Sequence, residues 1–445
     1  MSDEDRPSSS SSKRASLLRL KSKVKEVKQV VMSSQLPQTH YKKEVTRPTR
    51  LTGLFPNTTN PVVFSAPMLG TANGRLAAEV SKAGGFGFIP AGYNFNPESG
   101  PDHLGQLGEE LKIARKVLDL EQATLTAVPV GVGFILCHES ARTHFIERAI
   151  PVLQEYSPQA VWLFAPRVED VEGGVVRGII DVLHDNGFVV FYQVGTVKAV
   201  KEAVRDGADV VVAQGTDAGG HQFARGAGTM SFLREVVEVV KGEKERTGRE
   251  VEVVGAGGVV DGRGWWLRWL WGLMRLLWGR GSFSLRRRRR QSLGRSLQRQ
   301  RTGPRQLSKG YTGADAVVMG TRFILAEEAT TPKFRQELIA KTTDGASSTF
   351  KHTVMDDIQG TAIWPKIYDG RAIVGGSVED HLNGVPVEDN IRLFKEAAEK
   401  GETDRTITWA GSGVGLVSKI QPAGEIVKEV REEALQCIKE LQTLF

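Results

Sequence analysis

The chain has 445 residues, of which 40% are hydrophobic and 25% are charged, with 49 glycines. This composition is typical of a soluble globular protein large enough for a barrel with an additional segment. Two cysteines, Cys137 and Cys437, exclude a disulfide framework and a cysteine-based metal site. No apolar run is long enough to cross a bilayer and no signal-peptide core precedes residue 40, so we expect an intracellular, cytoplasmic protein without a membrane partner.

The net charge of +7 has a local source. Residues 265–311 contain twelve Arg, one Lys and no acidic residue, which gives this stretch +13 and leaves −6 for the remainder. Because the remainder is mildly acidic, the charge gives no reason to expect a nucleic-acid partner.

Residues 1–48 are rich in serine and basic residues, and this composition predicts a disordered tail. From Pro61 onward, apolar segments alternate with amphipathic ones. Eight segments read as strands: 62–68, 86–90, 128–136, 160–165, 188–194, 209–213, 251–255 and 316–319. Six helices are expected between them, at 74–83, 107–120, 141–156, 171–185, 196–206 and 230–245.

Eight alternating units favour an α/β fold in which residues 55–327 form a closed (β/α)8 TIM barrel. The alternation stops after residue 327, so we expect residues 328–445 to be a C-terminal helical extension that caps the barrel. It should consist of helices and loops and close with a long helix at about 424–441. In such a barrel the carboxyl ends of all strands lie on one face.

The strand at 209–213 continues into Gln214 and a loop that ends in Gly219-Gly220-His221. The glycines leave bare backbone for a flat ligand, and His221 would stand at the barrel mouth, where an imidazole could remove a proton from a carbon acid. A loop histidine bonded to a nearby carbonyl is the alternative. Asp217 is the nearest acid, but its spacing establishes no dyad. The other histidines show no metal-ligand spacing, so we expect no metal site: His40, His103, His138, His144, His184, His352 and His381.

Two glycine turns follow the seventh and eighth strands, where barrels commonly bind phosphate. They are Gly257-Gly258 and Gly320-Thr321, in which backbone N–H groups and a hydroxyl could face the oxygens without any Lys or Arg. Ordinary strand-end turns are the alternative. Ala66-Pro67-Met68 ends the first strand and offers a soft apolar surface, which together with a phosphate site suggests a flavin across the mouth.

These residues resemble the nitronate monooxygenase family, formerly called 2-nitropropane dioxygenases. Five ordered motifs carry the resemblance, at 66–68, 81–87, 212–221, 255–264 and 313–323. The resemblance implies an FMN-dependent barrel that oxidises small alkyl nitronates with O₂ to a carbonyl compound and nitrite without NAD(P)H. It implies that His221 is the catalytic base for neutral nitroalkanes. A homodimeric assembly is possible. The implied cofactor contacts are Ala66, Pro67, Met68, Gln214, Gly219, Gly220, Gly257, Gly258, Gly320 and Thr321.

Two other functions stay open at this point. A flavin-dependent enoyl-acyl-carrier-protein reductase shares the same motifs but uses NAD(P)H, although the long helical C-terminus favours the nitronate enzyme. A catalytically inactive barrel is the second alternative, because residues 265–311 interrupt the pattern where the family has one short Ala/Val-rich helix.

That interruption holds five of the eight tryptophans and the run Arg286 to Arg290. Trp is encoded only by the codon TGG. If the codons of residues 265–282 are read in a frame shifted by one base, they permit the amino-acid sequence Val-Val-Ala-Ala-Val-Ala-Leu-Gly-Ala-Asp-Ala-Ala-Ala-Met-Gly-Thr-Arg-Phe. Our hypothesis is out-of-frame translation, from a gene-model error or a frameshifted duplication, and sequencing the transcript would decide it. A genuine basic arm that binds nucleic acid or an anionic membrane is the alternative. If the protein is made as written, we expect Trp265 to Trp278 to replace the seventh helix and Arg280 to Gln306 to be disordered.

Overall fold

The computed structural model describes residues 49–122, 126–266, 314, 316–361 and 363–443. Eight parallel strands close into a barrel in the order β1-β2-β3-β4-β5-β6-β8-β9, which confirms the predicted fold. The strands are β1 (Val63–Ser65), β2 (Phe86–Pro90), β3 (Val128–Ile135), β4 (Pro158–Phe164), β5 (Val189–Val194), β6 (Val210–Gln214), β8 (Glu252–Ala256) and β9 (Ala316–Met319). The barrel closes through β1 and β9, where Phe64 is in register with Val318.

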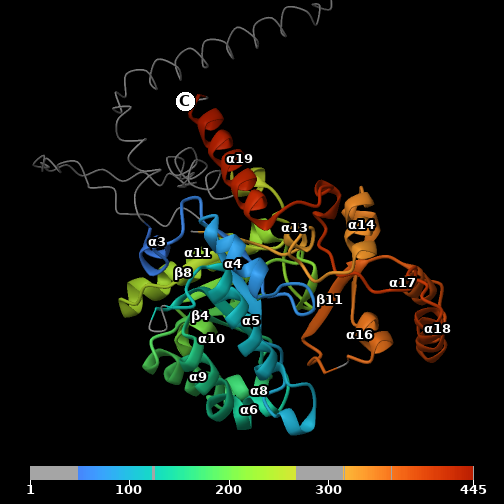
Figure 1. Ribbon diagram of the computed structural model, residues 1–445, viewed down its shortest axis with the longest axis horizontal. Coiled ribbons are helices and arrows are strands. Elements are labelled where there is room, and N and C mark those ends of the chain that lie inside the picture. Colours follow the sequence, from blue (N-terminus) through green and yellow to red (C-terminus); the bar gives the residue numbers. More distant parts are fainter. Residues whose placement is uncertain (1–48, 123–125, 267–313, 315, 362, 444–445) are drawn as a thin grey trace, which may run out of the picture. The chain divides into compact units, whose positions relative to one another are not determined.

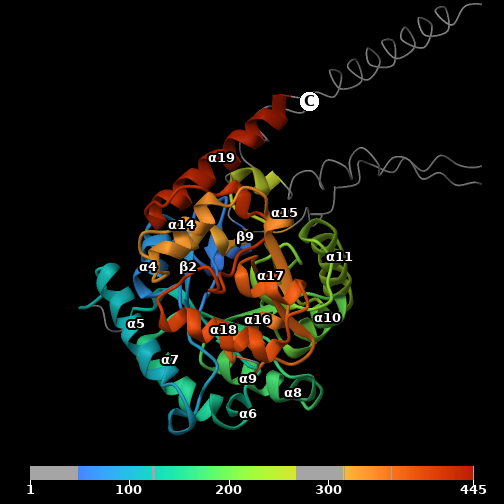
Figure 2. The same ribbon diagram turned by 90° about the vertical axis from the view of Figure 1, so that its right-hand side faces the viewer.

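Helices surround this barrel (Figures 1 and 2). They are α4 (Gly74–Lys82), α5 (His103–Val117), α6 (Ser140–His144), α7 (Ile150–Tyr156), α8 (Val168–Glu172), α9 (Val175–Asp185), α10 (Val197–Asp206) and α11 (Thr229–Thr247). Two predicted helices are divided. The π-helical turn Phe145–Ala149 separates α6 from α7, and Gly173-Gly174 separates α8 from α9 because Gly174 takes a left-handed conformation with φ +77°. The expected seventh helix and the tail at 1–48 lie outside the described residues.

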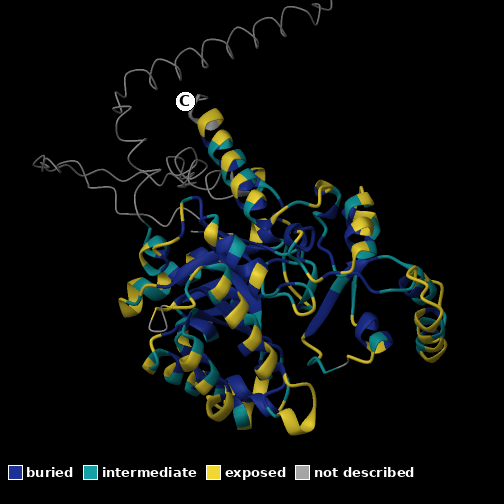
Figure 3. Ribbon diagram, viewed as in Figure 1, coloured by how far each residue is buried: buried dark blue, intermediate teal, exposed yellow. Residues whose placement is uncertain are grey.

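Large side chains fill the barrel interior, and the strands are its most buried elements (Figure 3). Phe64, Phe86, Phe88 and Phe191 contact one another with ring centroids 5.1 to 6.1 Å apart. The glycine at position 131 of β3 makes room for them, since a Cβ there would lie 2.2 Å from the Phe88 ring. Interiors of small barrels are packed in this way, so a ligand has to bind at an end of the barrel.

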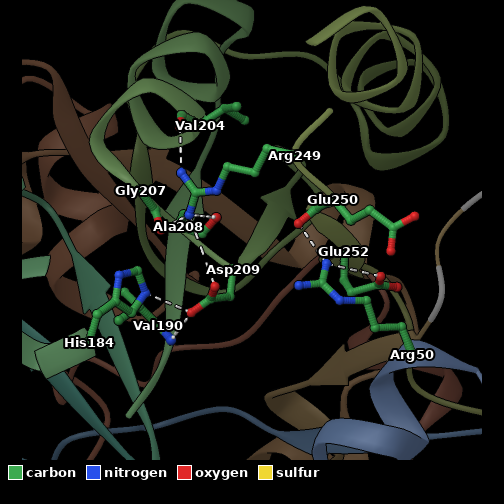
Figure 4. Close-up of polar contacts among 10 residues, drawn as sticks. All are labelled: Arg50, His184, Val190, Val204, Gly207, Ala208, Asp209, Arg249, Glu250 and Glu252. Atoms are coloured by element: carbon green, nitrogen blue, oxygen red, sulfur yellow. Dashed lines mark hydrogen bonds and ion pairs between the residues drawn. The ribbon is translucent and has the colours of Figure 1, made fainter. Parts of the chain in front are cut away.

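The short helix α3 (Arg50–Leu54) closes the end of the barrel at which the strands begin. Leu51 and Phe55 are completely buried, and the Phe55 ring lies 4.4 Å from that of Phe86. Arg50 donates a 2.6 Å hydrogen bond to the backbone carbonyl of Glu250 and lies 3.5 Å from the Glu252 carboxylate (Figure 4). These contacts connect α3 to β8, so the segment before the first strand belongs to the barrel structure.

Asp209, just before β6, joins several elements at the same end (Figure 4). Its carboxylate accepts hydrogen bonds from His184 Nε2 and from the backbone N–H of Val190, each at 2.9 Å. Arg249 lies 4.0 Å from the same carboxylate. Arg249 also donates to the backbone carbonyls of Val204, Gly207 and Ala208. Polar networks at this face of a barrel contribute to stability rather than to chemistry.

The segment after β9 is not made of helices and loops alone. Its strands β10 (Thr349–His352) and β11 (Tyr368–Ile373) form an antiparallel sheet with β7 (Gly220–Phe223), in the order β10-β11-β7. The helices are α13 (Thr321–Ile324), α14 (Lys333–Lys341), α15 (Gly345–Ser348), α16 (Val354–Gln359), α17 (Gly376–Leu382), α18 (Val387–Glu399) and α19 (Ala423–Thr443). In Figure 2 the helices α16, α17 and α18 lie across one end of the barrel.

Helix α19 packs on the outside of the barrel, where Ile426, Val427 and Val430 share a buried cluster with Leu76 and Phe323. Its bounds correspond to the long closing helix expected at 424–441. No helix in the described part of the chain combines the length and apolarity that a membrane span needs.

Candidate active site

A cavity of about 440 Å³ lies at the carboxyl ends of the barrel strands. The residues singled out from the sequence all line it: Ala66, Pro67, Met68, Gln214, Gly219, Gly220, His221, Gly257, Gly258, Gly320 and Thr321. They come from the ends of β1, β6, β8 and β9 and from β7. The segment after β9 contributes further lining residues, among them Arg335, Trp364 and Trp409. The fold therefore brings the predicted residues together around one cavity.

His221 lies in strand β7 rather than in a loop, and its backbone is in register with Gly370 of β11. Its ring stacks on that of Trp364, with centroids 3.8 Å apart and planes inclined by 12°. The ring of Trp409 lies 4.8 Å away on a tilted plane. The His221 side chain is 18% exposed. Strand pairing and two indole rings thus hold the imidazole in one orientation at the cavity wall.

A buried carboxylate contacts the same imidazole. His221 Nε2 lies 2.8 Å from Oδ1 and 3.0 Å from Oδ2 of Asp356, in helix α16. The Asp356 side chain is 5% exposed, and Thr361 donates a further hydrogen bond of 2.9 Å to its Oδ1. Because an ionised carboxylate only accepts hydrogen bonds, Nε2 carries the hydrogen. Nδ1 then holds the lone pair of the neutral ring, and it has no hydrogen-bond partner among the described residues.

Sequence reasoning missed Asp356, which lies 135 positions after His221. Asp217, the acid considered there, has a different role. Its carboxylate accepts a 2.7 Å hydrogen bond from the backbone N–H of Thr229, the first residue of α11. Its backbone carbonyl accepts another of 3.0 Å from the Ser412 N–H. Asp217 therefore fixes the loop before His221 and takes no part in a dyad.

A series of hydrogen bonds links three side chains at the barrel mouth to the backbone of His221. The indole N–H of Trp162 donates to Gln193 Oε1 at 3.0 Å, and Gln193 Nε2 donates to Gln214 Oε1 at 2.7 Å. Gln214 Nε2 then donates to the backbone carbonyl of His221 at 3.2 Å. These bonds fix the orientation of the Gln214 amide and leave it one N–H for a ligand. Gln193, which also lines the cavity, was not identified from the sequence.

Both glycine turns line the cavity. Gly257 and Gly258 have φ values of +100° and +71°, which other residues rarely adopt. A Cβ on Gly257 would lie 2.9 Å from the Gly215 carbonyl oxygen, so this position is closely packed as well. A Cβ on Gly320 would lie 3.5 Å from the Met68 sulfur, an ordinary contact distance. The need for glycine is therefore stronger at 257 and 258 than at 320.

Thr321 and Gly219 connect the barrel to the loop at 410–413. The hydroxyl oxygen of Thr321 accepts a 3.0 Å hydrogen bond from the Gly411 N–H, which leaves the hydroxyl hydrogen free to donate. A Cβ on Gly219 would lie 2.3 Å from the backbone of Ala410, so only glycine allows this close approach. The glycine-rich turn around Gly411 packs on the site, and Gly411 and Gly413 line the cavity.

The loop after β1 forms another wall. Pro67 packs against β3, where a Cβ on Gly133 would lie 2.4 Å from the proline ring. Ala66 continues the barrel ladder through a 3.0 Å hydrogen bond from its N–H to the Met319 carbonyl. Met68 is partly buried among the residues around β9. The three residues therefore present a fixed apolar surface to the cavity.

Arg335 also lines the cavity, whereas the sequence indicated that the glycine turns need no cation. It is half-buried, and burial lowers the pKa of its guanidinium. Its Nε atom is buried without a hydrogen-bond partner, and among the described residues no carboxylate forms an ion pair with it. The cavity therefore contains a positive charge that these residues do not balance.

Burial shifts the pKa of two further groups near the barrel, His103 and Cys137. His103 Nδ1 accepts hydrogen bonds from the backbone N–H groups of Tyr93 and Asn94, and burial lowers the pKa of this histidine. Burial also raises the pKa of the Cys137 thiol to about 12. Within the described ranges, no group of three or more His, Cys, Asp or Glu side chains could hold a metal ion.

Comparison with known proteins identifies the protein family. The nitronate monooxygenase family model matches residues 49–265. The nitronate monooxygenase of Neurospora crassa is 45% identical over 401 residues, which cover 88% of this chain and 94% of the relative. The nitronate monooxygenase npaC of Metarhizium robertsii is 30% identical over 388 residues, which cover 85% of this chain and 92% of the relative. Both relatives match the chain across the barrel and the segment that follows it.

Solved structures share the fold at lower identity. FabK from Thermotoga maritima superposes with a TM-score of 0.61 at 21% identity, covering 90% of this chain and all 100% of that one. Nitroalkane oxidase from Streptomyces ansochromogenes gives a TM-score of 0.55 at 22% identity, covering 88% and 100%. The sequence relatives confirm the resemblance carried by the five motifs. The chain belongs to the nitronate monooxygenase family, and it is an oxidoreductase of this flavin-dependent, nitronate-oxidising class.

Proposed function

We propose that this chain uses FMN to oxidise alkyl nitronates with O₂ to a carbonyl compound and nitrite, and that His221 is the base for neutral nitroalkanes. One observation carries the proposal. The same cavity has two open glycine turns in its wall and an imidazole backed by a buried carboxylate. The turns suit a phosphate group, and the imidazole suits removal of a proton from carbon.

The cavity residues fit a flavin mononucleotide. Gly257 and Gly258 have no side chains of their own beside their backbone N–H groups, and the Thr321 hydroxyl keeps a hydrogen to donate. These groups, together with Gly320, would hold the phosphate. Ala66, Pro67 and Met68 would contact the ring system on one side, and the remaining Gln214 N–H could donate to it. Gly219 and Gly220 add backbone without side chains beside His221. When bound, the flavin supplies the acceptor through which electrons pass from the nitronate to O₂.

The dyad geometry supports a base at a defined atom. Asp356 holds the hydrogen on Nε2, so Nδ1 is the nitrogen that would accept the α-proton of a nitroalkane. After the transfer, the buried carboxylate would face the imidazolium and offset its charge. Trp364 and Trp409 restrict ring rotation and exclude water from the imidazole face. A nitronate has already lost this proton, so its oxidation does not need the base.

The test is the visible spectrum of the purified protein without oxygen. We expect a bound yellow flavin whose oxidised band disappears when an alkyl nitronate is added in the absence of NAD(P)H. Admission of O₂ should restore the band and release nitrite. A flavin that stays oxidised with the nitronate but reacts with NAD(P)H would refute the proposal and favour the reductase. A colourless protein that does not take up added FMN would favour an inactive barrel.

A further inference from the structure

The strongest unexplained feature of the cavity is the Arg335 guanidinium. It lies in the first turn of helix α14 and lines the cavity, and its Nε is buried without an acceptor. The guanidinium carbon lies 5.8 Å from the ring centroid of the neighbouring Phe334. A partly buried cation without a counter-charge is unfavourable, and protein interiors normally pair such a group. This arrangement indicates that the partner of Arg335 is an anionic ligand.

The position of Arg335 indicates which part of the ligand it meets. Its neighbour Gln336 is buried, and the Gln336 amide donates to the backbone carbonyls of Ile324 and Ala326 at 2.9 and 3.0 Å. Ile324 ends the short helix that begins at Thr321, and both residues line the cavity. These two bonds fix the start of α14 to the segment directly after the Gly320-Thr321 turn. The start of α14, which carries Arg335, therefore lies beside the segment that follows the Gly320-Thr321 turn.

We propose that Arg335 binds the phosphate ester of the flavin mononucleotide and makes the site select FMN over riboflavin. This inference rests on the proposed function. The glycine N–H groups and the Thr321 hydroxyl are neutral donors, whereas a phosphate monoester carries nearly two negative charges near pH 7. A guanidinium adds the missing charge and two parallel N–H groups that match two phosphate oxygens.

Binding of two flavins to the apoprotein tests the assignment. Flavin fluorescence is titrated with FMN and with riboflavin, which has the same ring and ribityl chain but no phosphate. We expect R335Q to weaken FMN binding about 10- to 100-fold, the usual effect of losing a charge-assisted hydrogen bond. Riboflavin binding should change by less than about threefold. R335K should fall between the wild type and R335Q for FMN, because it keeps the charge but loses the planar fork.

Lys333 offers a matched control. It lies two positions away in the same turn of α14, is exposed and does not line the cavity. K333Q removes the same charge from the protein, so its FMN-to-riboflavin affinity ratio should equal that of the wild type. An equal fall in both variants would mean that only the overall field matters, and this outcome would overturn the proposal.

The remaining outcomes separate this inference from the proposed function. If wild-type protein binds FMN and oxidises nitronates while R335Q keeps the wild-type affinity ratio, the inference is wrong and the function stands. The inference is also wrong if R335Q changes only the KM of nitronates that carry a second anionic group. If R335Q does not fold, the affinity ratio of R335K decides, and an unchanged ratio there overturns the assignment. A wild-type protein that binds no flavin overturns both proposals.

Discussion

Replacing Asp356 with asparagine should separate the oxidation of neutral nitroalkanes from the oxidation of preformed nitronates. The change keeps the size of the side chain but removes the charge that His221 Nε2 meets at 2.8 and 3.0 Å. A hydrogen bond to a charged group contributes about 1.5–3 kcal/mol, and each 1.36 kcal/mol in a barrier is tenfold in rate. The asparagine amide can also turn its NH₂ toward the ring and hold it in the wrong tautomer.

We therefore expect D356N to lower kcat/KM for a neutral nitroalkane about 10- to 100-fold. With the corresponding nitronate, which needs no base, the loss should stay below about threefold. Oxygen consumption measures both rates at one pH, with the nitronate prepared in alkali and added just before the measurement. The isotope effect of an α-deuterated nitroalkane should rise in D356N, since proton removal then becomes more rate-limiting.

Asp357 provides the control for this experiment. It is the next residue of α16 and is exposed, so D357N changes the charge of the same helix without touching His221. D357N should match the wild type with both substrates. Equal losses of D356N activity with nitroalkane and nitronate would mean that Asp356 only supports the fold of the cavity wall. Full activity of D356N with the nitroalkane would refute the assignment of His221 as a base positioned by Asp356.

Three further predictions concern the cofactor turn and stability. The G257A variant should release flavin more readily than the wild type, because a φ of +100° strains an alanine backbone by about 1–3 kcal/mol. The rate of flavin dissociation measures this effect. D209N should lower the free energy of unfolding in urea by about 1–3 kcal/mol with little change in KM, because the Val190 N–H and His184 would lose their charged acceptor (Figure 4). Burial raises the pKa of Cys137 from 9.0 to about 12, so the folded protein keeps a proton that the unfolded chain loses. The free energy of unfolding should therefore fall as the pH rises from 9.0 toward 12. This fall should be less steep in the C137A variant, and the same slope in the variant and the wild type would contradict the prediction.

The barrel could be predicted because each of its strands carries a local signal. Val210–Gln214, for example, has three consecutive valines and lies between a helix that ends at Gly207 and a glycine-rich loop. Buried parallel strands read as continuous apolar runs, and the helices between them show their own period. The cavity-lining residues that the sequence did predict followed from the same logic, because barrel topology collects all the strand ends on one face.

Strands β10 and β11 could not be predicted in the same way. Thr349–His352 and Tyr368–Ile373 are mostly polar and short, and neither shows a sustained alternation. They form because Phe350 pairs with Ala372 and because Gly370 pairs with His221. The second pairing joins segments far apart in the chain. Asp356 was missed for the same reason. A buried carboxylate is recognisable only when its partner is known, and no spacing rule links positions 221 and 356.

The position of β9 bears directly on residues 265–311, which lie between the two phosphate turns in the chain. Strand β9 pairs with β8 through Val254 and Ala316 and with β1 through Ser65 and Met319. The in-frame residues 316–321 therefore supply the eighth strand and the Gly320-Thr321 turn. Whatever the origin of residues 265–311, the paired strands that carry the proposed phosphate site are complete without them.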